Sequence, residues 1–238
     1  MKSYFHPVKK WVILALLLDC ILPLKALANQ AESQLKIPIP SGHFNYINGS
    51  WSSYVIFDKT NFTYSYMDIA IRNNESCAYI QGCVWMELKV RLMGKPEVVT
   101  RLLVERDKDG PGRILKVAVW VEGYQPFWVP ESFIEKGNNK VTKFTSIELA
   151  MPQDTRIGRF RGKLATLTKF VLRNKEDSIT AYLAKEVAPI GIVALESPSM
   201  DMYLLDWGMK KESWMPEEPV SFYWWILNEI FKAVEENN

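Results

Sequence analysis

Apolar and polar residues alternate with a period of two through long stretches of this chain. Between Cys83 and Met93 every second residue is apolar, and charged residues occupy several of the positions between them. Successive side chains of a strand point to opposite faces, so this pattern predicts a strand with one buried face. A helix would scatter the same residues around its circumference. The apolar set is Val84, Met86, Leu88, Val90 and Leu92.

The same alternation recurs before and after this segment, and turn residues separate the repeats. Asn73-Asn74, Gly94-Lys95-Pro96 and the run 107–112 supply the chemistry of chain reversals. Such short turns leave no room for the crossovers that parallel neighbours need, so consecutive strands should pair antiparallel as a meander. The predicted strands are residues 51–58, 62–72, 83–93, 97–105 and 113–122.

The second half of the chain is less regular. Prolines and the run Gly137-Asn138-Asn139 interrupt residues 123–156, which should be mostly loop with one short strand at 141–150. Further strands are predicted at residues 162–172, 178–184, 191–197 and 202–207. A sheet of roughly nine or ten strands tends to curl or close. The predicted fold class is mainly β: a curved antiparallel meander, as an open half-barrel or a barrel, with a C-terminal amphipathic helix.

The helix is predicted over residues 219–236, with Pro219 in its first turn. Its apolar residues recur at spacings of four and three, and polar residues occupy the other side. Leaving a large apolar side chain in water costs ~1.5–3 kcal/mol, so this stripe should cover an apolar surface. The stripe consists of Val220, Trp224, Leu227, Phe231 and Val234.

The first 28 residues have the form of a cleavable secretion signal. Lys9 and Lys10 precede an apolar run that extends to Leu18, and Ala26-Leu27-Ala28 matches a signal peptidase site. The prediction is a periplasmic or secreted bacterial protein in which residues 29–48 form a flexible lead-in and residues 49–238 form a single β domain.

The N-terminal segment has two alternatives to cleavage. A retained membrane anchor is disfavoured because Asp19, Pro23 and Lys25 shorten the apolar stretch below what a bilayer of ~30 Å requires. Lipidation of Cys20 is the second alternative, although Asp19 stands where lipidation signals have a small residue. No transmembrane segment is therefore expected after cleavage.

Charge and cysteine content narrow the possible partners. Cleavage of the signal removes four lysines and one aspartate. The remaining chain has almost equal numbers of acidic and basic residues, so nucleic-acid binding is not expected. Cys77 and Cys83 are the thiols that remain, and an oxidising compartment favours a disulfide between them across a short turn. The alternative is two unpaired thiols, one of them buried.

The residues offer little for catalysis. His43 is the single histidine left after cleavage, so the chain has few residues suited to histidine catalysis or to metal binding. Glu87 is best interpreted as a solvated strand residue with Lys89 and Arg91 as charge partners. We predict no catalytic residue, metal or cofactor, and keep a carboxylate-dependent hydrolase as an alternative. The strand-borne carboxylates are Glu87, Glu105, Glu196 and Asp206.

Aromatic residues make up 13% of the chain. They are typical of an ordinary β core, but they could also line an apolar cavity covered by the terminal helix. In that case the protein would be non-enzymatic and would bind a hydrophobic ligand or a lipidated partner. The alternative is an envelope protein that docks a partner through its C-terminal helix. The candidate lining residues are Trp85, Trp120, Trp224 and Phe231.

Four short motifs lie between Gly49 and Gly208. They are Gly49-Ser-Trp51-Ser-Ser-Tyr54, Cys83-Val-Trp85-Met-Glu87, Val187-Ala-Pro189-Ile-Gly191-Ile-Val193 and Leu205-Asp206-Trp207-Gly208. Together they resemble a group of uncharacterised exported bacterial proteins, which are similar to the periplasmic lipoprotein-localisation carriers of the LolA/LolB type. The resemblance implies an open half-barrel around an apolar cavity, an exported location and a lipid or lipidated partner.

Overall fold

The computed structural model describes residues 44–75, 77, 82–107, 110–134, 147–150, 153–157, 160–164, 167–173, 178–210 and 212–235. Contacts within the chain divide it into two units, Pro38–Trp225 and a second unit made of Met1–Ile37 with Ile226–Asn238. The predicted secretion signal, Cys20 and His43 lie outside the described residues.

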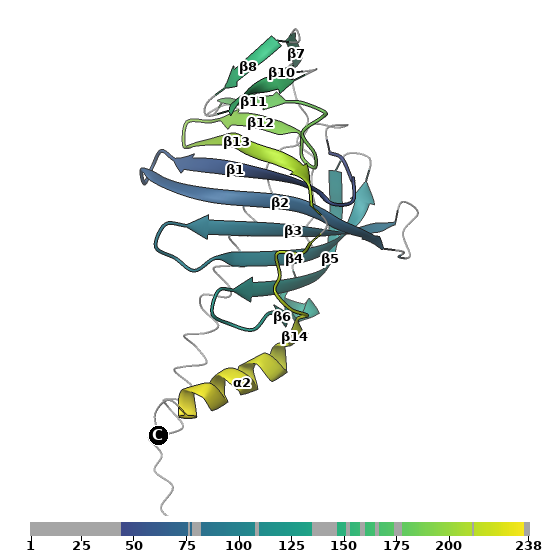
Figure 1. The fold of residues 1–238 in the computed structure, drawn as a ribbon, viewed down its shortest axis with the longest axis vertical. Helices are drawn as coiled ribbons and strands as arrows, with labels where there is room; N and C mark the ends of the chain where they lie inside the picture. The colour runs from purple at the N-terminus through teal and green to yellow at the C-terminus, as the bar shows by residue number, and fades with distance from the viewer. Residues whose placement is uncertain are drawn as a thin grey trace, which may run out of the picture. The chain divides into compact units, whose positions relative to one another are not determined.

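The unit Pro38–Trp225 is built on a mostly antiparallel sheet of 12 strands in the order β14-β6-β5-β4-β3-β2-β1-β13-β12-β11-β10-β7 (Figure 1). The order ends on two different edge strands, so the sheet is open. β8 and β9 form a separate pair. The strands are β1 Ser50–Asp58, β2 Thr63–Glu75, β3 Cys83–Leu92, β4 Val98–Asp107, β5 Gly110–Val121, β6 Phe127–Trp128, β7 Ile147–Ala150, β8 Gln153–Ile157, β9 Phe160–Leu164, β10 Leu167–Arg173, β11 Ser178–Leu183, β12 Ile192–Glu196, β13 Met200–Met209 and β14 Val220–Ser221. The helices are η1 Glu131–Phe133 and α2 Phe222–Glu235.

The prediction of a mainly β protein with a C-terminal helix is confirmed. The first five strands pair antiparallel with their neighbours in the chain, as the turn spacing predicts. Each predicted boundary in this meander lies within a few residues of the observed one. The alternation of side chains and the short turns are therefore sufficient to define this half of the sheet.

Other predicted boundaries are wrong. The single strand predicted at 162–172 is divided between β9 and β10, and the two-residue strands β6 and β14 are too short for any periodicity to show. α2 begins at Phe222 because Val220 and Ser221 instead pair in parallel with β6. Most of the predicted lead-in lies outside the described residues, and within its described part the side chain of Phe44 is buried.

The apolar residues predicted on β3 lie on one face of the sheet, here called the apolar face. Met86 lies opposite Ile71 of β2 and Leu102 of β4, and all three side chains are buried. Val84 and Leu88 are buried as well, while Leu92, at the end of the strand, is 36% exposed. The period-two prediction therefore holds for the interior of β3.

The opposite face of the same strands, here called the polar face, carries charged side chains. Glu87 of β3 lies opposite Arg101 of β4, and Lys89 of β3 lies opposite Asp68 of β2. Glu87 and Asp68 are both buried, which requires partners for their charges.

Candidate functional site

The chain crosses the polar face between β13 and β14. β13 lies beside β1 within the sheet, whereas β14 is the edge strand next to β6. Residues 212–219, here called the connecting segment, therefore pass over the strands between them (Figure 1). Just before the segment, the backbone N–H of Lys210 donates to the carbonyl of Gly49 at 2.6 Å, and just after it Val220 donates to Pro126 at 3.0 Å.

Glu87 is fully buried and holds the connecting segment on the sheet. Its Oε2 accepts hydrogen bonds from Nε of Arg72 and from the backbone N–H of Trp214, each at 2.8 Å. Its Oε1 accepts from Nε of Arg101 at 3.1 Å and from the Ser213 hydroxyl. Burial raises the pKa of Glu87, but the hydrogen bonds from Ser213 and Trp214 and the charge of Arg72 outweigh burial and hold the pKa below its ordinary value.

The interpretation of Glu87 as a solvated carboxylate beside Lys89 and Arg91 is therefore wrong. Both of these cations pair with Asp68 instead, at 3.2 and 3.4 Å. The connecting segment removes Glu87 from water, and a buried carboxylate needs close charged and hydrogen-bonding partners. Periodicity along β3 carries no information about a segment that arrives from so far along the chain.

Tryptophan side chains fill the space beside this cluster. The guanidinium of Arg72 lies 4.4 Å from the centre of the Trp214 ring, and Nζ of Lys89 lies 5.1 Å from it. Such cation–π contacts contribute about 0.5–2 kcal/mol each, with the larger values where water is excluded. They tie Trp214 to the sheet independently of its backbone hydrogen bond.

Two of the four predicted lining residues belong to this region of the polar face. Trp120 and Trp128 pack against a buried cluster that includes Met215 of the connecting segment. Trp85 contacts Trp128, with ring centres 5.9 Å apart. The structure thus brings Trp85 and Trp120 into one aromatic layer with Trp128, and whether they contact a ligand stays a prediction.

The other predicted lining residues lie on α2. Trp224 is 56% exposed, and the residue next to it, Trp225, is 7% exposed. Trp225 packs on Phe127 of β6 at 4.6 Å and on Phe222 at 6.2 Å between ring centres. Phe231 is exposed and belongs to the second unit.

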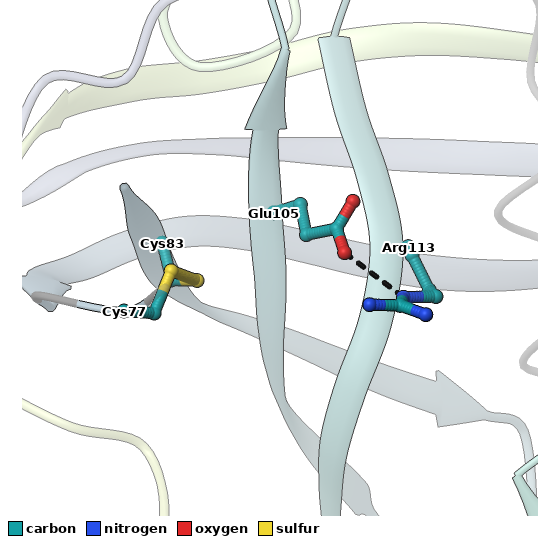
Figure 2. Close-up of a disulfide and its surroundings, with 4 residues drawn as sticks. All are labelled: Cys77, Cys83, Glu105 and Arg113. Carbon is teal, nitrogen blue, oxygen red and sulfur yellow. Dashed lines mark hydrogen bonds and ion pairs between the residues drawn. A yellow bond between two sulfur atoms is a disulfide. The ribbon is translucent and has the colours of Figure 1, made fainter. Parts of the chain in front are cut away.

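The remaining carboxylates do not converge on one cleft. Glu105 pairs with Arg113 at 2.9 Å (Figure 2), and Asp206 is exposed. Glu196 lies opposite Asp201 in the register of β12 and β13, and Nζ of Lys59 neutralises Asp201 at 2.6 Å.

Tyr203 lies on the same face of β13 as Asp201, and its hydroxyl donates to Glu196 at 3.3 Å. Burial and the charges of Asp201 and Glu196 raise the pKa of Tyr203 to about 12. Neutral Tyr203 therefore serves as a hydrogen-bond donor here. Among the described residues, no group of three or more His, Cys, Asp or Glu is placed to share a metal ion.

The predicted disulfide is present. Cys77 and Cys83 are bonded with their Cα atoms 5.8 Å apart, and Cys83 begins β3 directly opposite Glu105 of β4 (Figure 2). A structural disulfide is a weak indication of an oxidising, extracytoplasmic compartment. None of the helices in the described part of the chain has the length and hydrophobicity needed to span a membrane.

Three neighbouring turns at one end of the sheet expose large apolar side chains. Phe62 in the β1–β2 turn is 77% exposed, Met93 in the β3–β4 turn is 78% exposed, and Tyr124 after β5 is 49% exposed. The turns are adjacent because β2 pairs with β3 and β4 pairs with β5 (Figure 1). We call Phe62, Met93 and Tyr124 the turn-end surface.

The β1–β2 turn is held in one shape by Asp58. Its carboxylate accepts hydrogen bonds from the backbone N–H groups of Thr60 and Asn61 and from the Asn61 side chain. These hydrogen bonds, led by the one from the Asn61 side chain, lower the pKa of Asp58. Phe62 follows with a φ of 54°, a backbone conformation that a bulky side chain rarely adopts.

Sequence patterns did not single out the turn-end surface, Arg72 or Trp214. Phe62 is the first residue of one predicted strand, and Met93 is the last residue of another. An available signal was the position of each beside residues that favour turns, Asn61 and Gly94. No comparable local signal points to Trp214.

Comparison with known proteins adds no assignment. The sequence matches no model of a known protein family and shows no significant similarity to a curated protein. The resemblance to the lipoprotein-localisation carriers therefore depends on the four motifs of this chain and stays a prediction.

Proposed function

We propose that this is a non-catalytic extracytoplasmic protein that acts at a lipid surface, where it binds a hydrophobic ligand or a lipidated partner. The observation that carries the proposal is the turn-end surface. Leaving a large apolar side chain in water costs ~1.5–3 kcal/mol relative to burying it. Contiguous exposed apolar residues are typical of interaction sites.

The conformation of Phe62 supports this interpretation. A left-handed backbone costs about 1–2 kcal/mol for a residue other than glycine, and the cost is greatest for a bulky side chain. Phe62 combines a φ of 54° with an exposed fraction of 77%. The Phe62 ring contacts the ring of Phe57 on β1, with ring centres 6.4 Å apart, but most of its surface stays in water. Contact with an apolar partner would bury that surface.

The charges of the turns favour a lipid interface as that partner. Asp58 is used within its own turn, and Glu122 accepts a hydrogen bond from the backbone N–H of Glu97 at 3.1 Å. Lys95 is exposed at the tip of the β3–β4 turn. Tyrosine and lysine beside apolar side chains are typical of the boundary between water and a bilayer.

The open sheet and the disulfide are compatible with the remaining parts of the proposal. A sheet with free edges can curve around a ligand, and the sequence predicts that Trp85 and Trp120 line its cavity. The other two predicted lining residues, Trp224 and Phe231, are exposed on α2 and are not part of this proposal. The disulfide suits an oxidising compartment such as a bacterial periplasm.

Vesicle binding tests the proposal. The native protein should sediment with phosphatidylcholine vesicles, and the double variant Phe62→Ser/Met93→Ser should bind at least about tenfold more weakly, which corresponds to about 1.4 kcal/mol. Met209→Ser is the matched control, since Met209 is 62% exposed but lies opposite Ser50, at the other end of β1. Equal binding by the double variant and the control, or no binding by the native protein, would refute the proposal.

The ligand is tested separately. Lipid extraction and mass spectrometry of the purified native protein should recover a bound hydrophobic molecule, and a hydrophobic dye should find a saturable site. Vesicle binding without either result would leave the protein at the lipid surface but remove the ligand from the proposal.

A further inference from the structure

The α2 helix has apolar residues on two of its sides. Only one of these sides packs against the rest of the chain in the first turn. Trp225 and Phe222 contact Phe127 on β6, and Phe133 of η1 lies 6.1 Å from Phe222 between ring centres. Trp224 and Tyr223 are 56% and 75% exposed. Phe222 and Trp225 therefore fix the start of the helix on the sheet. Tyr223 and Trp224 form a separate, exposed aromatic side.

Helix geometry extends this exposed side along α2. Residues three, four and seven positions apart lie on one side of a helix. Leu227 and Phe231 follow Trp224 by three and seven positions, and Leu227 follows Tyr223 by four. We call Tyr223, Trp224, Leu227 and Phe231 the outer stripe. Trp225 lies on a different side of the helix from these residues, and Leu227 and Phe231 are 46% and 63% exposed.

Acidic residues outnumber basic ones in the sequence of α2 and of the residues that flank it. The chain from Glu217 to its end contains five acidic residues and the single cation Lys232. Nζ of Lys232 is paired with Glu229 at 2.8 Å, and Glu218 is paired with Arg101 of β4 at 3.7 Å. Glu235, in the last turn of α2, is exposed. Helices that lie on bilayers carry lysine and arginine on their polar side, so an anionic lipid surface would repel this one. A protein groove with basic residues at its edge complements both the stripe and its surroundings.

We propose that α2 binds, through its outer stripe, in an apolar groove edged by lysine or arginine on a partner protein. The spacing of Trp224, Leu227 and Phe231 is that of helices that place i, i+3 and i+7 side chains in such grooves. Aromatic side chains dominate the binding energy of interfaces of this kind. This inference goes beyond the proposed function, because it rests on a different surface and names a different partner.

Site-specific crosslinking tests which molecule contacts the stripe. A benzoylphenylalanine photocrosslinker replaces Leu227 in one variant and Glu229, on another side of α2, in the control. In cells that make the protein, Leu227 should crosslink to one distinct protein and Glu229 should not. Crosslinks only to lipid, to a second copy of the chain, or to residues 1–37 of its own chain would overturn the proposal, as would the absence of any crosslink.

Binding of the crosslinked protein, identified by mass spectrometry and purified, then tests the chemistry. Trp224→Ala and Phe231→Ala should each weaken binding at least tenfold, while Ile47→Ser, at a 50% exposed site outside α2, should change it less than twofold. Binding should also weaken several-fold as the salt concentration rises from about 0.05 to 0.5 M, because salt screens the basic edge of the groove. Equal effects of all three substitutions, or no dependence on salt, would contradict the inference.

Discussion

The backbone N–H of Trp214 donates a hydrogen bond of 2.8 Å to Oε2 of Glu87. This bond joins a segment that crosses the sheet to a carboxylate that is fully buried within it. The guanidinium of Arg72 lies against both residues, 2.8 Å from the carboxylate and 4.4 Å from the centre of the Trp214 ring. Glu87 and Arg72 therefore both help to fix the path of the chain from β13 to the helix α2.

Glu87→Ala should lower the free energy of unfolding by about 3–5 kcal/mol, because it leaves the buried guanidinium of Arg72 without its counter-ion. Urea unfolding measures the loss. Glu105→Ala is the control: its pair with Arg113 is partly exposed, and such pairs contribute about 0–1 kcal/mol. Equal losses in the two variants would show that Glu87 does not have this role.

Stability should fall in acid as Glu87 takes up a proton. Its folded pKa lies below the ordinary value of 4.5, so the ionised form stabilises the fold above that pH, and the stabilisation is lost as the pH falls through the folded pKa. Unfolding of the native protein and of Glu87→Gln should be compared between about pH 7 and pH 2. The variant should be less stable near neutral pH, and the difference between the two should shrink in acid; a constant difference would contradict the assignment.

The two adjacent tryptophans of α2 should respond differently to truncation. Trp225→Ala removes a buried ring from Phe127 and should cost about 3 kcal/mol or more. Trp224→Ala removes an exposed ring and should change stability by about 0.5 kcal/mol or less. Urea unfolding followed by circular dichroism measures both, and similar losses would mean that Trp224 is also packed in solution.

The disulfide should stabilise the fold modestly. Cys77 and Cys83 are six positions apart, and closing so short a loop contributes about 2 kcal/mol. The variant Cys77→Ala/Cys83→Ala should fold, unfold at lower urea concentration than the oxidised protein, and be insensitive to a reducing agent. Thiol labelling of the denatured, unreduced native protein should find no free Cys77 or Cys83. Labelling of both thiols would show that the disulfide is absent.

Phe62→Asn should make the protein more stable and bind vesicles more weakly. Asparagine tolerates the left-handed backbone better than phenylalanine, so the substitution should add about 0.5–1 kcal/mol to the free energy of unfolding. Thermal unfolding and vesicle sedimentation on the same samples measure the two effects. A loss of stability with unchanged vesicle binding would show that Phe62 serves the fold rather than the lipid surface.

Much of the sheet could be predicted from the sequence because its causes are local. Alternation along β3 and the turns on either side of it depend on side chains and backbone geometry a few residues apart. The same holds for the Cys77–Cys83 bond. The short strands β6 and β14 could not be predicted, since two residues carry no period, and the pairing of Val220 with Phe127 depends on where the chain returns to the sheet.

By itself, the sequence determined the first five strands and their pairing, the Cys77–Cys83 pair and a helix after the sheet. Only the tertiary structure decided that Glu87 is buried, that Trp225 rather than Trp224 contacts the sheet, and that Phe62 and Met93 lie in neighbouring turns. The reason is the range of the interactions. Ser213 reaches Glu87 across 126 positions, and no local pattern records which distant residue will remove a side chain from water.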